Sequence, residues 1–381
     1  MYLSTSGELA RFVADAKDVT AMGIDTEFMR ERTYYPRLCL IQVSLPETTA
    51  IIDPLTIEDL EPFFGLLRDR RIVKVLHAGG QDLEIFFRLM GEVTAPVFDS
   101  QVAATLAGFP QQVGYGALVE KLLGVQLDKG DTFTDWARRP LTRNQIEYAH
   151  NDVRYLLPVH DRLLHSLERD ERLEWLERDF ARMEDPITYV VEPMEQWRRL
   201  KRVSALNRRQ LAVAREVAAW REIEAQRRDI PKRWLLSDES SIEIARRMPR
   251  DAEALAAVRG VKDKLPRAAY ADLLRAVERG VAIPDDRLPF IERKRRGPAV
   301  DVEGAVDLMV ALVRLRAREH GVAMPILASR DDLERLAAGD TEGHPLLEGW
   351  RFEIVGEELI ALLEGRLTLA LREGAVVVER R

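Results

Sequence analysis

Cysteine is nearly absent from this chain of 381 residues, since Cys39 is the only one. No internal disulfide can form, and a cysteine-rich zinc site is excluded. Long apolar runs are absent too, because the longest charge-free stretch, 100–119, contains three glutamines and a proline and cannot span a membrane. The first ten residues have neither a basic start nor an apolar run, so no signal peptide is expected. These absences predict a soluble protein of the cytoplasm, where thiols stay reduced.

The chain also lacks an overall excess of positive charge, which is the simplest sign of a protein that coats nucleic acid. There are 57 Lys and Arg against 64 Asp and Glu, a net charge of −7. The charge is uneven along the chain, because 198–250 holds 15 basic and 7 acidic residues, a local excess of +8. Hydrophobic residues make up 46% and charged residues 32%, which rules out a disordered chain and predicts two or three globular domains.

The first half has the pattern of an α/β fold. One capping box, Thr5 with Glu8, begins a helix, and another, Thr142 with Gln145, begins a long helical run to about residue 177. Strands are expected at 22–28, 38–45, 49–53 and 72–77, the first three pairing as a meander. Further helices are expected at 59–67, 82–90, 100–107 and 116–123. Strands followed by strand–helix alternation predict a mixed sheet with helices on its faces.

The second half is expected to be entirely helical. The segment 185–195 has two prolines and no helical period, and a second break follows the basic run 293–296 at Gly297-Pro298. Two stretches resemble each other weakly, because 270–280 and 355–365 both end a helix at glycine. They belong either to two copies of one small helical module or to two unrelated bundles. The predicted domains are 1–190, a linker 191–204, a first helical domain 205–288 and a second helical domain 297–381.

Two acidic residues stand in an otherwise apolar strand, MGIDTEF. Asp25 and Glu27 are two positions apart, so both carboxylates point to the same face of the strand. No lysine or arginine within the strand neutralises them, and a hard divalent cation is the natural partner. The alternative is a pair of solvated acids on a surface strand.

A third carboxylate follows a buried strand. Asp82 stands in the first turn of a helix, just after the passage Gly79-Gly80. Sites of α/β proteins usually lie at this edge of the sheet. A helix N-terminus also favours an Asp that has no function, so both interpretations stay open. His77, at the end of the same strand, is expected to be packed or hydrogen-bonded rather than a metal ligand.

The fourth carboxylate lies on a helix together with a tyrosine. Tyr148 and Asp152 are four residues apart and share one helix face. They are either site residues or a core tyrosine and a solvated acid, and His150 lies off their shared face. If all four carboxylates and the tyrosine converge on one mouth of a sheet, the set suits two-metal phosphoryl transfer. Four negative charges balance two Mg²⁺ ions, and the tyrosine hydroxyl can hold the attacking water.

Three motifs resemble those of the DEDD superfamily of exonucleases. They are DTEFMRERTYYPRLCLIQVS at 25–44, HAGGQDLEIF at 77–86 and YAHNDVRYLLP at 148–158. The tyrosine four residues before the last aspartate is similar to the subclass with Tyr rather than His. The motif neighbourhoods, including DKGDTFTDWARRPLTRNQIEYAHND, resemble the ribonuclease D family in particular, and the helical modules resemble HRDC domains. The resemblance covers nearly the whole chain, and Gln81 departs from it where the family often has an acid that is not expected to be a ligand.

The resemblance implies an α/β, DnaQ-like (ribonuclease H-like) exonuclease domain followed by two all-α HRDC-like domains, the second divergent. It implies a monomeric 3′–5′ exoribonuclease that releases nucleoside 5′-monophosphates, with tRNA precursors and other structured small RNAs as substrates. Tyr148 would orient the hydrolytic water. Carried over by motif, the residues that bind two Mg²⁺ or Mn²⁺ ions are Asp25, Glu27, Asp82 and Asp152.

Weaker assignments follow from the same resemblance. Phe28 would stack on a terminal base and Lys129 would contact a phosphate. For Trp136 and Arg139 two roles stay open, either fixing the loop before the last catalytic helix or contacting RNA. A DNA 3′–5′ exonuclease would use the same catalytic residues, because no motif reports a contact to a 2′-hydroxyl. A non-catalytic RNA-binding protein would not need all five residues, and a helicase is excluded because the chain has no GxxxxGK[ST] loop.

The basic segment 198–250 is the expected source of affinity for a long RNA, since the catalytic mouth itself is acidic. The alternative is that its cations are solvated helix faces paired with nearby acids. The residues proposed for RNA contact are Arg208, Arg209, Arg227, Arg228, Lys232 and Arg233.

Overall fold

The computed structural model describes residues 1–127, 134–291 and 302–380, which fall into two compact units. Unit 1 comprises Met1–Glu27, Cys39–Tyr189 and Arg296–Arg381, and unit 2 comprises Phe28–Leu38 and Val190–Arg295. By its contacts, therefore, the short segment Phe28–Leu38, which follows Asp25 and Glu27, belongs to unit 2. The domain boundaries proposed from the sequence stay predictions. Within the described ranges, no helix has both the length and the apolar character that crossing a membrane requires.

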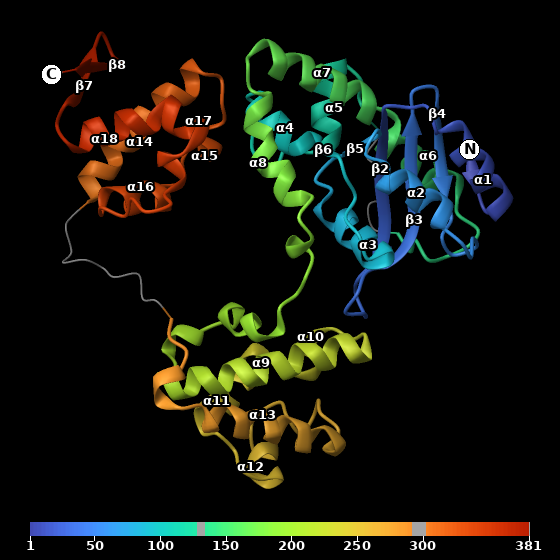
Figure 1. The fold of residues 1–381 in the computed structure, drawn as a ribbon, viewed down its shortest axis with the longest axis vertical. Helices are drawn as coiled ribbons and strands as arrows, with labels where there is room; N and C mark the ends of the chain where they lie inside the picture. Colours follow the sequence, from blue (N-terminus) through green and yellow to red (C-terminus); the bar gives the residue numbers. More distant parts are fainter. Residues whose placement is uncertain (128–133, 292–301, 381) are drawn as a thin grey trace. The chain divides into compact units, whose positions relative to one another are not determined.

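A six-stranded mixed sheet is the centre of unit 1 (Figure 1). Its strands are β1 (Tyr2–Leu3), β2 (Ala21–Met29), β3 (Arg37–Leu45), β4 (Thr48–Ile52), β5 (Val73–Leu76) and β6 (Val97–Asp99), in the order β1-β4-β3-β2-β5-β6. β3 and β4 are antiparallel, whereas β1 pairs parallel with β4, and β5 pairs parallel with β2 and β6. The neighbours β2, β3 and β4 form the expected meander. The short strands β1 and β6 were not expected.

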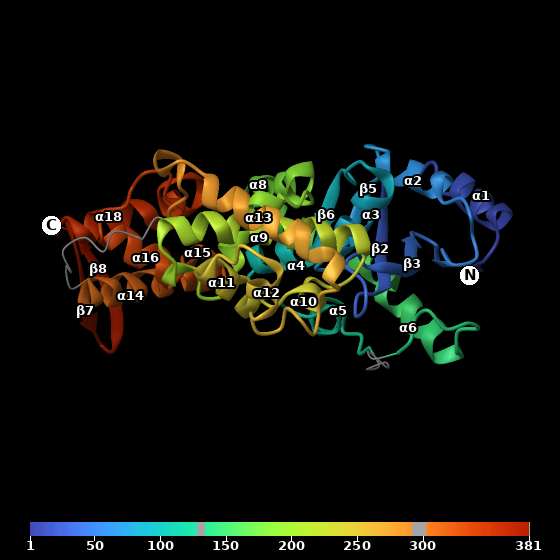
Figure 2. The same ribbon diagram turned by 90° about the horizontal axis from the view of Figure 1, so that it is seen from below.

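Helices cover both faces of this sheet. They are α1 (Ser6–Asp15), α2 (Glu61–Arg68), α3 (Gly80–Met90), α4 (Ser100–Leu106), α5 (Tyr115–Leu123), α6 (Arg143–Arg154), α7 (Leu156–Arg169) and α8 (Leu173–Met183). Figure 2 shows α1 and α2 beside one face and α6 beside the other. Both predicted capping boxes, at Thr5 and Thr142, are present.

The long helical run expected from residue 142 to about 177 is wrong as a single helix, because it is broken twice. Pro158 stands in the first turn of α7 and has no N–H to donate to the carbonyl of Arg154, so α6 ends there. At the second break Glu171 has φ of 56°, a left-handed conformation that no helix continues.

A glycine decides how closely α7 approaches the sheet. A Cβ on Gly23 of β2 would lie 2.9 Å from the Cβ of Leu156, the first residue of α7. Asp25 and Glu27 are two and four positions further along the strand, so they point to the same face as Gly23. The two carboxylates therefore face the side of the sheet on which α7 lies, and α6 leads directly into α7.

The C-terminal part of unit 1 contains helices and one hairpin. Its elements are α14 (Glu303–Glu319), α15 (Met324–Leu327), α16 (Arg330–Ala337), α17 (Gly349–Arg351), α18 (Glu357–Leu363), β7 (Leu367–Arg372) and β8 (Ala375–Arg380). The expected fold class holds with one correction, since β7 and β8 form an antiparallel hairpin in a half expected to be entirely helical. Its two turn residues, Glu373 and Gly374, both have positive φ, as a type I′ turn requires. Trp175 of α8 stacks on Trp350 of α17, with ring centroids 4.7 Å apart.

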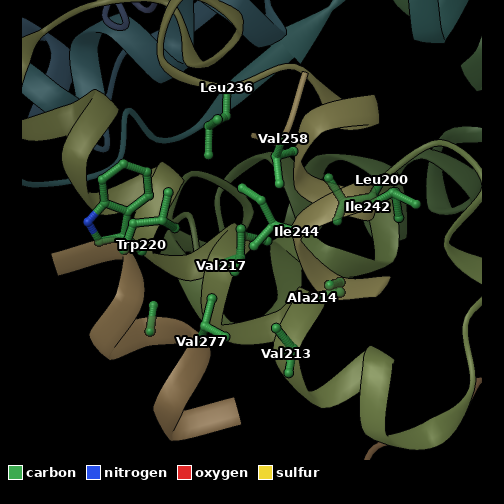
Figure 3. Packing of buried hydrophobic residues seen from close by; sticks show 14 of the residues in the cluster. Leu200, Val213, Ala214, Val217, Trp220, Leu236, Ile242, Ile244, Val258 and Val277 are labelled. Atoms are coloured by element: carbon green, nitrogen blue, oxygen red, sulfur yellow. The ribbon is translucent and has the colours of Figure 1, made fainter. Parts of the chain in front are cut away.

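Unit 2 is a small helical bundle around one long helix. Its helices are α9 (Arg208–Arg228), α10 (Lys232–Leu235), α11 (Asp238–Arg247), α12 (Ala252–Ala256) and α13 (Tyr270–Ala282). Figure 3 shows Val217 and Trp220 of α9 among the apolar side chains that form the core of this unit. A Cβ on Gly280 of α13 would lie 2.5 Å from the Cα of Val213, so glycine permits α9 and α13 to pack closely.

The segment Phe28–Leu38 is held to this bundle by hydrogen bonds to α9 and the residue that follows it. The hydroxyl of Tyr34 donates to the buried carboxylate of Glu222. The backbone N–H of Tyr35 donates to Oδ1 of Asp229 at 3.0 Å. Removal of the helical residues would leave these two tyrosines without their partners.

Candidate active site

β2 supplies the first two carboxylates of the site. Asp25 and Glu27 are partly exposed, and neither forms an ion pair with any described residue. Burial raises the pKa of Asp25 well above its ordinary value, and the charges of Asp82, Asp152 and Glu27 raise it further. Burial and the charges of Asp152 and Asp82 raise the pKa of Glu27 to about 8. The four carboxylates are therefore close enough to repel one another.

The third carboxylate, Asp82, stands in the first turn of α3 and is only 7% exposed. Burial raises its pKa to about 6, although a hydrogen bond donated by the hydroxyl of Thr26 works in the opposite direction. The turn before α3 is held by Asp99, whose carboxylate accepts the backbone N–H groups of Ala78 at 3.2 Å and Gly79 at 2.8 Å. Ala78 has φ of 58°, so these hydrogen bonds stabilise a conformation that alanine rarely adopts.

α6 supplies the fourth carboxylate and the tyrosine. Burial raises the pKa of Asp152 to about 7, and its Oδ2 is buried without a hydrogen-bond donor among the described residues. Burial and the charges of Asp152, Glu27 and Asp25 raise the pKa of Tyr148, so its hydroxyl keeps its proton. The structure thus brings together all five residues singled out in the sequence. Their catalytic roles stay predictions.

The two histidines near the motifs take part in hydrogen bonds outside this group. His77 lies with Nδ1 2.9 Å from the hydroxyl of Ser100 and Nε2 3.0 Å from the carbonyl of Val113, as expected for a packed, hydrogen-bonded histidine. Burial lowers its pKa. The Nδ1 of His150 lies 2.8 Å from the hydroxyl of Thr49 on β4.

Two residues beside the site were missed in the sequence. Tyr115, the first residue of α5, accepts the backbone N–H of Tyr155 at 3.1 Å. Burial raises its pKa, and the charges of Asp152 and Asp25 add to that effect, which places its hydroxyl near the carboxylates. No local pattern marks this tyrosine, because only tertiary packing brings α5 to α7 and to Tyr155, the residue between α6 and α7. Asp99 carries a detectable signal, since an aspartate directly before a helix is a typical N-cap.

The weaker assignments have different outcomes. Lys129 lies outside the described residues, and Phe28 belongs to unit 2. For Trp136 and Arg139, the contacts present are those that fix the loop before α6. Trp136 is 4% exposed and its ring lies 5.9 Å from that of Tyr148, and Arg139 forms an ion pair with Asp53.

Divalent metal ions suit the donors of this site. The four carboxylates form no ion pair with a described residue, and Oδ2 of Asp152 is buried without a hydrogen-bond donor among them. Carboxylate oxygens are the hard ligands that Mg²⁺ and Mn²⁺ prefer. Among the described residues, no three carboxylate, histidine or thiol groups are yet close enough together to hold an ion. A bound cation would offset the repulsion between these carboxylates.

The basic residues proposed for RNA contact are mostly paired within unit 2, which favours the alternative interpretation for them. Arg227 and Arg228 both pair with Glu224, Lys232 pairs with Glu222, and Arg209 pairs with Asp285. Arg208 donates to the carbonyl of Leu288 at 2.9 Å.

A different set of cations in unit 2 forms no ion pair within the part of the chain that the structure describes. A groove of about 660 Å³ is lined by residues of α11 and of the segments around it, two of them the helix N-terminal serines Ser237 and Ser240. Its lining cations that form no ion pair with a described residue are Lys201, Arg202, Arg246, Arg259 and Lys264. Glu239 and Glu243 also line it, and Glu243 pairs with Arg247.

Fold and site together define the class of protein as a 3′–5′ exonuclease. A family model described as 3′–5′ exonuclease matches residues 1–168, and a model of the HRDC domain matches residues 210–277. The crystal structure of Escherichia coli RNase D, described as an exoribonuclease involved in structured RNA processing, matches with a TM-score of 0.81 and 34% identity. That match covers 96% of this chain and 98% of the other.

The curated relatives identify the family. The ribonuclease D of Granulibacter bethesdensis is 42% identical over 97% of this chain and 94% of its own length. The ribonuclease D of Sphingobium indicum is 40% identical over 99% of this chain and 98% of its own length. The chain belongs to the ribonuclease D family. It is a 3′–5′ exoribonuclease of the DEDD superfamily, a group of exonucleases that depends on divalent metal ions.

Proposed function

We propose that this enzyme removes nucleotides one at a time from RNA 3′ ends by hydrolysis and releases nucleoside 5′-monophosphates. The observation that carries the proposal is the group of four carboxylates around Tyr148, none of which has a cationic partner among the described residues. Like charges held together in this way are expected where a cationic cofactor completes the site.

The residues proposed to hold two Mg²⁺ or Mn²⁺ ions are Asp25, Glu27, Asp82 and Asp152. Bound metal would polarise the scissile phosphate and lower the pKa of the attacking water. Tyr148 keeps its proton because burial and three neighbouring carboxylates raise its pKa. Its hydroxyl can donate to or accept from a water and so orient that water towards the phosphorus. Asp82 is oriented by the hydroxyl of Thr26.

The substrates proposed are tRNA precursors and other structured small RNAs, cleaved by a monomeric enzyme in the cytoplasm. The similarity to an exoribonuclease involved in structured RNA processing supports this class of substrate. An acidic site without metal repels phosphate, so a second surface has to provide affinity for the body of the RNA. The unpaired cations that line the groove of unit 2 have the charge that such a surface requires.

A time course on matched oligonucleotides tests the activity. RNA and DNA strands of the same sequence, labelled at the 5′ end, would be incubated with Mg²⁺ or with EDTA. Ladder formation on RNA with Mg²⁺ alone, with nucleoside 5′-monophosphates as products, is the expected result. Faster cleavage of the DNA strand would favour a DNA exonuclease. Binding of RNA without cleavage under any metal condition would favour a non-catalytic RNA-binding protein.

A further inference from the structure

One guanidinium ties the loop before α6 to three strands of the sheet. Arg139 donates from Nε to Oδ2 of Asp53 at 2.6 Å and from Nη2 to Oδ1 at 2.8 Å. The same Nη2 donates to the carbonyl of Cys39 on β3 at 2.8 Å. Asp53 directly follows β4, and its carboxylate also accepts the hydroxyl of Tyr2 on β1.

The other side of the guanidinium holds the loop itself. Nη1 of Arg139 donates to the carbonyl of Trp136 at 2.7 Å. The buried ring of Trp136 packs against Tyr148, with centroids 5.9 Å apart and planes inclined by 38°. Gln145, in the first turn of α6, donates to the hydroxyl of Thr134 at 3.0 Å, so a second bond links the loop to this helix.

The geometry of this cluster depends on arginine. Asp53 is fully buried, and its two oxygens are matched by two N–H groups of one planar fork. Burial works to raise the pKa of Asp53, but the hydrogen bonds from Arg139 and Tyr2 hold that pKa below its ordinary value. A lysine would keep the charge but could not bond both carboxylate oxygens, the Cys39 carbonyl and the Trp136 carbonyl at once.

We propose that Arg139 and Asp53 are positioning residues for Tyr148, and that they act through Trp136. The ion pair anchors the loop to the sheet, the loop holds the indole against the phenol ring, and the phenol hydroxyl is thereby kept where it can orient water. The inference rests on the proposed role of Tyr148. It assigns to Arg139 a role in the rate of the chemical step rather than in RNA affinity, because its donors are directed to protein oxygens.

The test compares Arg139→Lys with a matched control, Arg138→Lys, whose side chain is exposed and forms no ion pair with a described residue. Under single-turnover and steady-state conditions with Mg²⁺ and a short RNA, Arg139→Lys is expected to lower kcat by roughly 10- to 100-fold, as a misplaced catalytic group does. KM is expected to stay within about twofold of the wild-type value, since the guanidinium bonds protein oxygens and not the substrate. Arg138→Lys should leave both constants unchanged.

A double-mutant cycle separates positioning from general support of the fold. In a Tyr148→Phe background there is no hydroxyl left to position, so Arg139→Lys should lower kcat by less than about twofold. The same factor in both backgrounds would mean that Arg139 supports the fold without acting through Tyr148, and would overturn the proposal. A wild-type kcat for Arg139→Lys would overturn it as well.

A second variant keeps the test decisive if Arg139→Lys does not fold, as judged by circular dichroism. Trp136→Phe keeps an aromatic ring but removes part of the contact with Tyr148, and it should show the same loss of kcat and the same dependence on the tyrosine hydroxyl. An unchanged kcat for Trp136→Phe would refute the proposed route. Full activity of Tyr148→Phe would instead refute the proposed role of the tyrosine, so the two failures are distinguishable.

Discussion

Charged side chains are arranged in opposite ways around the sheet of unit 1 and in the helical bundle of unit 2. In unit 1, four carboxylates from β2, α3 and α6 influence one another, and each has its pKa raised by burial or by its neighbours. In the bundle, by contrast, most of the proposed RNA-binding cations are paired with acids. In unit 1 the unpaired carboxylates are the ones singled out in the sequence. In unit 2 the cations without an ion pair to a described residue are not the ones proposed from the sequence.

The difference between paired and unpaired side chains indicates which charged groups are expected to bind a ligand. A surface ion pair contributes little to stability. The acid of such a pair offsets the charge that its arginine presents to a phosphate. A cluster of like charges without partners destabilises the protein, and a bound ligand of opposite charge removes this repulsion. By this criterion unit 1 is expected to bind cations and the groove of unit 2 is expected to bind phosphates.

The largest effect is expected from removing one carboxylate of the cluster. Asp25→Asn or Asp152→Asn should abolish Mg²⁺-dependent hydrolysis, because the change removes the ligand charge and leaves the packing intact. The metal-free variants should unfold at the same temperature as the parent or slightly above it, since a repelling charge has been removed. Activity on a labelled RNA and thermal unfolding with EDTA would be measured together, with exposed Asp18→Asn as the control. Turnover near the wild-type rate would exclude the two-metal assignment.

A smaller but still large effect is expected from one hydroxyl. Tyr148→Phe should lower kcat by roughly 10²- to 10⁴-fold, the usual contribution of a group that acts on the attacking water. Thermal stability should change little because the ring remains in contact with Trp136. Tyr270→Phe, in the core of unit 2, is the matched control and should cleave RNA at the wild-type rate. Equal rates for the two variants would show that Tyr148 is a packing residue.

In unit 2 the comparison predicts which arginines matter for binding. Arg246→Gln with Arg259→Gln should weaken binding of a tRNA precursor and reduce the slope of log affinity against log salt by roughly 0.7–0.9 for each phosphate that is no longer bound. Arg227→Gln, which removes a cation already paired with Glu224, should change the slope much less. The measurement is a salt series in an Asp25→Asn background, which prevents cleavage.

Point variants are better suited to this question than a fragment ending near residue 195. Such a fragment would remove Glu222 and Asp229, the partners of Tyr34 and Tyr35, in the segment that continues directly from the acidic strand. Loss of activity in the fragment could then come either from the missing helical residues or from the loss of these partners of Tyr34 and Tyr35. Identical salt slopes for the double variant and Arg227→Gln would show that the groove does not contact phosphates.

The smallest expected effect is on the pH dependence of stability. Burial raises the pKa values of Asp82, Asp152 and Glu27 to about 6, 7 and 8, and neighbouring charges add to the effect at Asp82 and Glu27. A folded-state pKa raised above the unfolded value stabilises the protein below the unfolded pKa, and this contribution is lost as pH rises through the folded pKa. The metal-free protein should therefore lose stability between about pH 5 and 8.

Thermal unfolding with EDTA across this range measures the loss, and a parallel series with Mg²⁺ should be flatter. Asp152→Asn should reduce the slope of the metal-free series, whereas the exposed Glu174→Gln should not. A metal-free protein whose stability rises steadily from pH 5 to 8 would contradict the assigned direction of these shifts.

Several elements were predictable because their signals are local. The capping boxes at Thr5 and Thr142 involve residues three positions apart, and the strands of the meander are apolar runs separated by turn residues. The break between α6 and α7 also had a local cause in Pro158, but the strong helical period on both sides concealed it. The hairpin of β7 and β8 was missed because a short pair of strands follows a long helical region, where the helical pattern dominated the interpretation.

By itself the sequence determined the α/β character of the first half, and its three motifs indicated the family. Strand and helix periods also place Asp25 with Glu27, and Tyr148 with Asp152, on common faces. Only the tertiary structure decided which cations of unit 2 are unpaired, that Tyr115 lies beside the carboxylates, and that Asp53 holds Arg139. These partners are separated by tens of residues along the chain. An ion pair of this kind depends on where the fold brings two side chains, and no local pattern of residues contains that information.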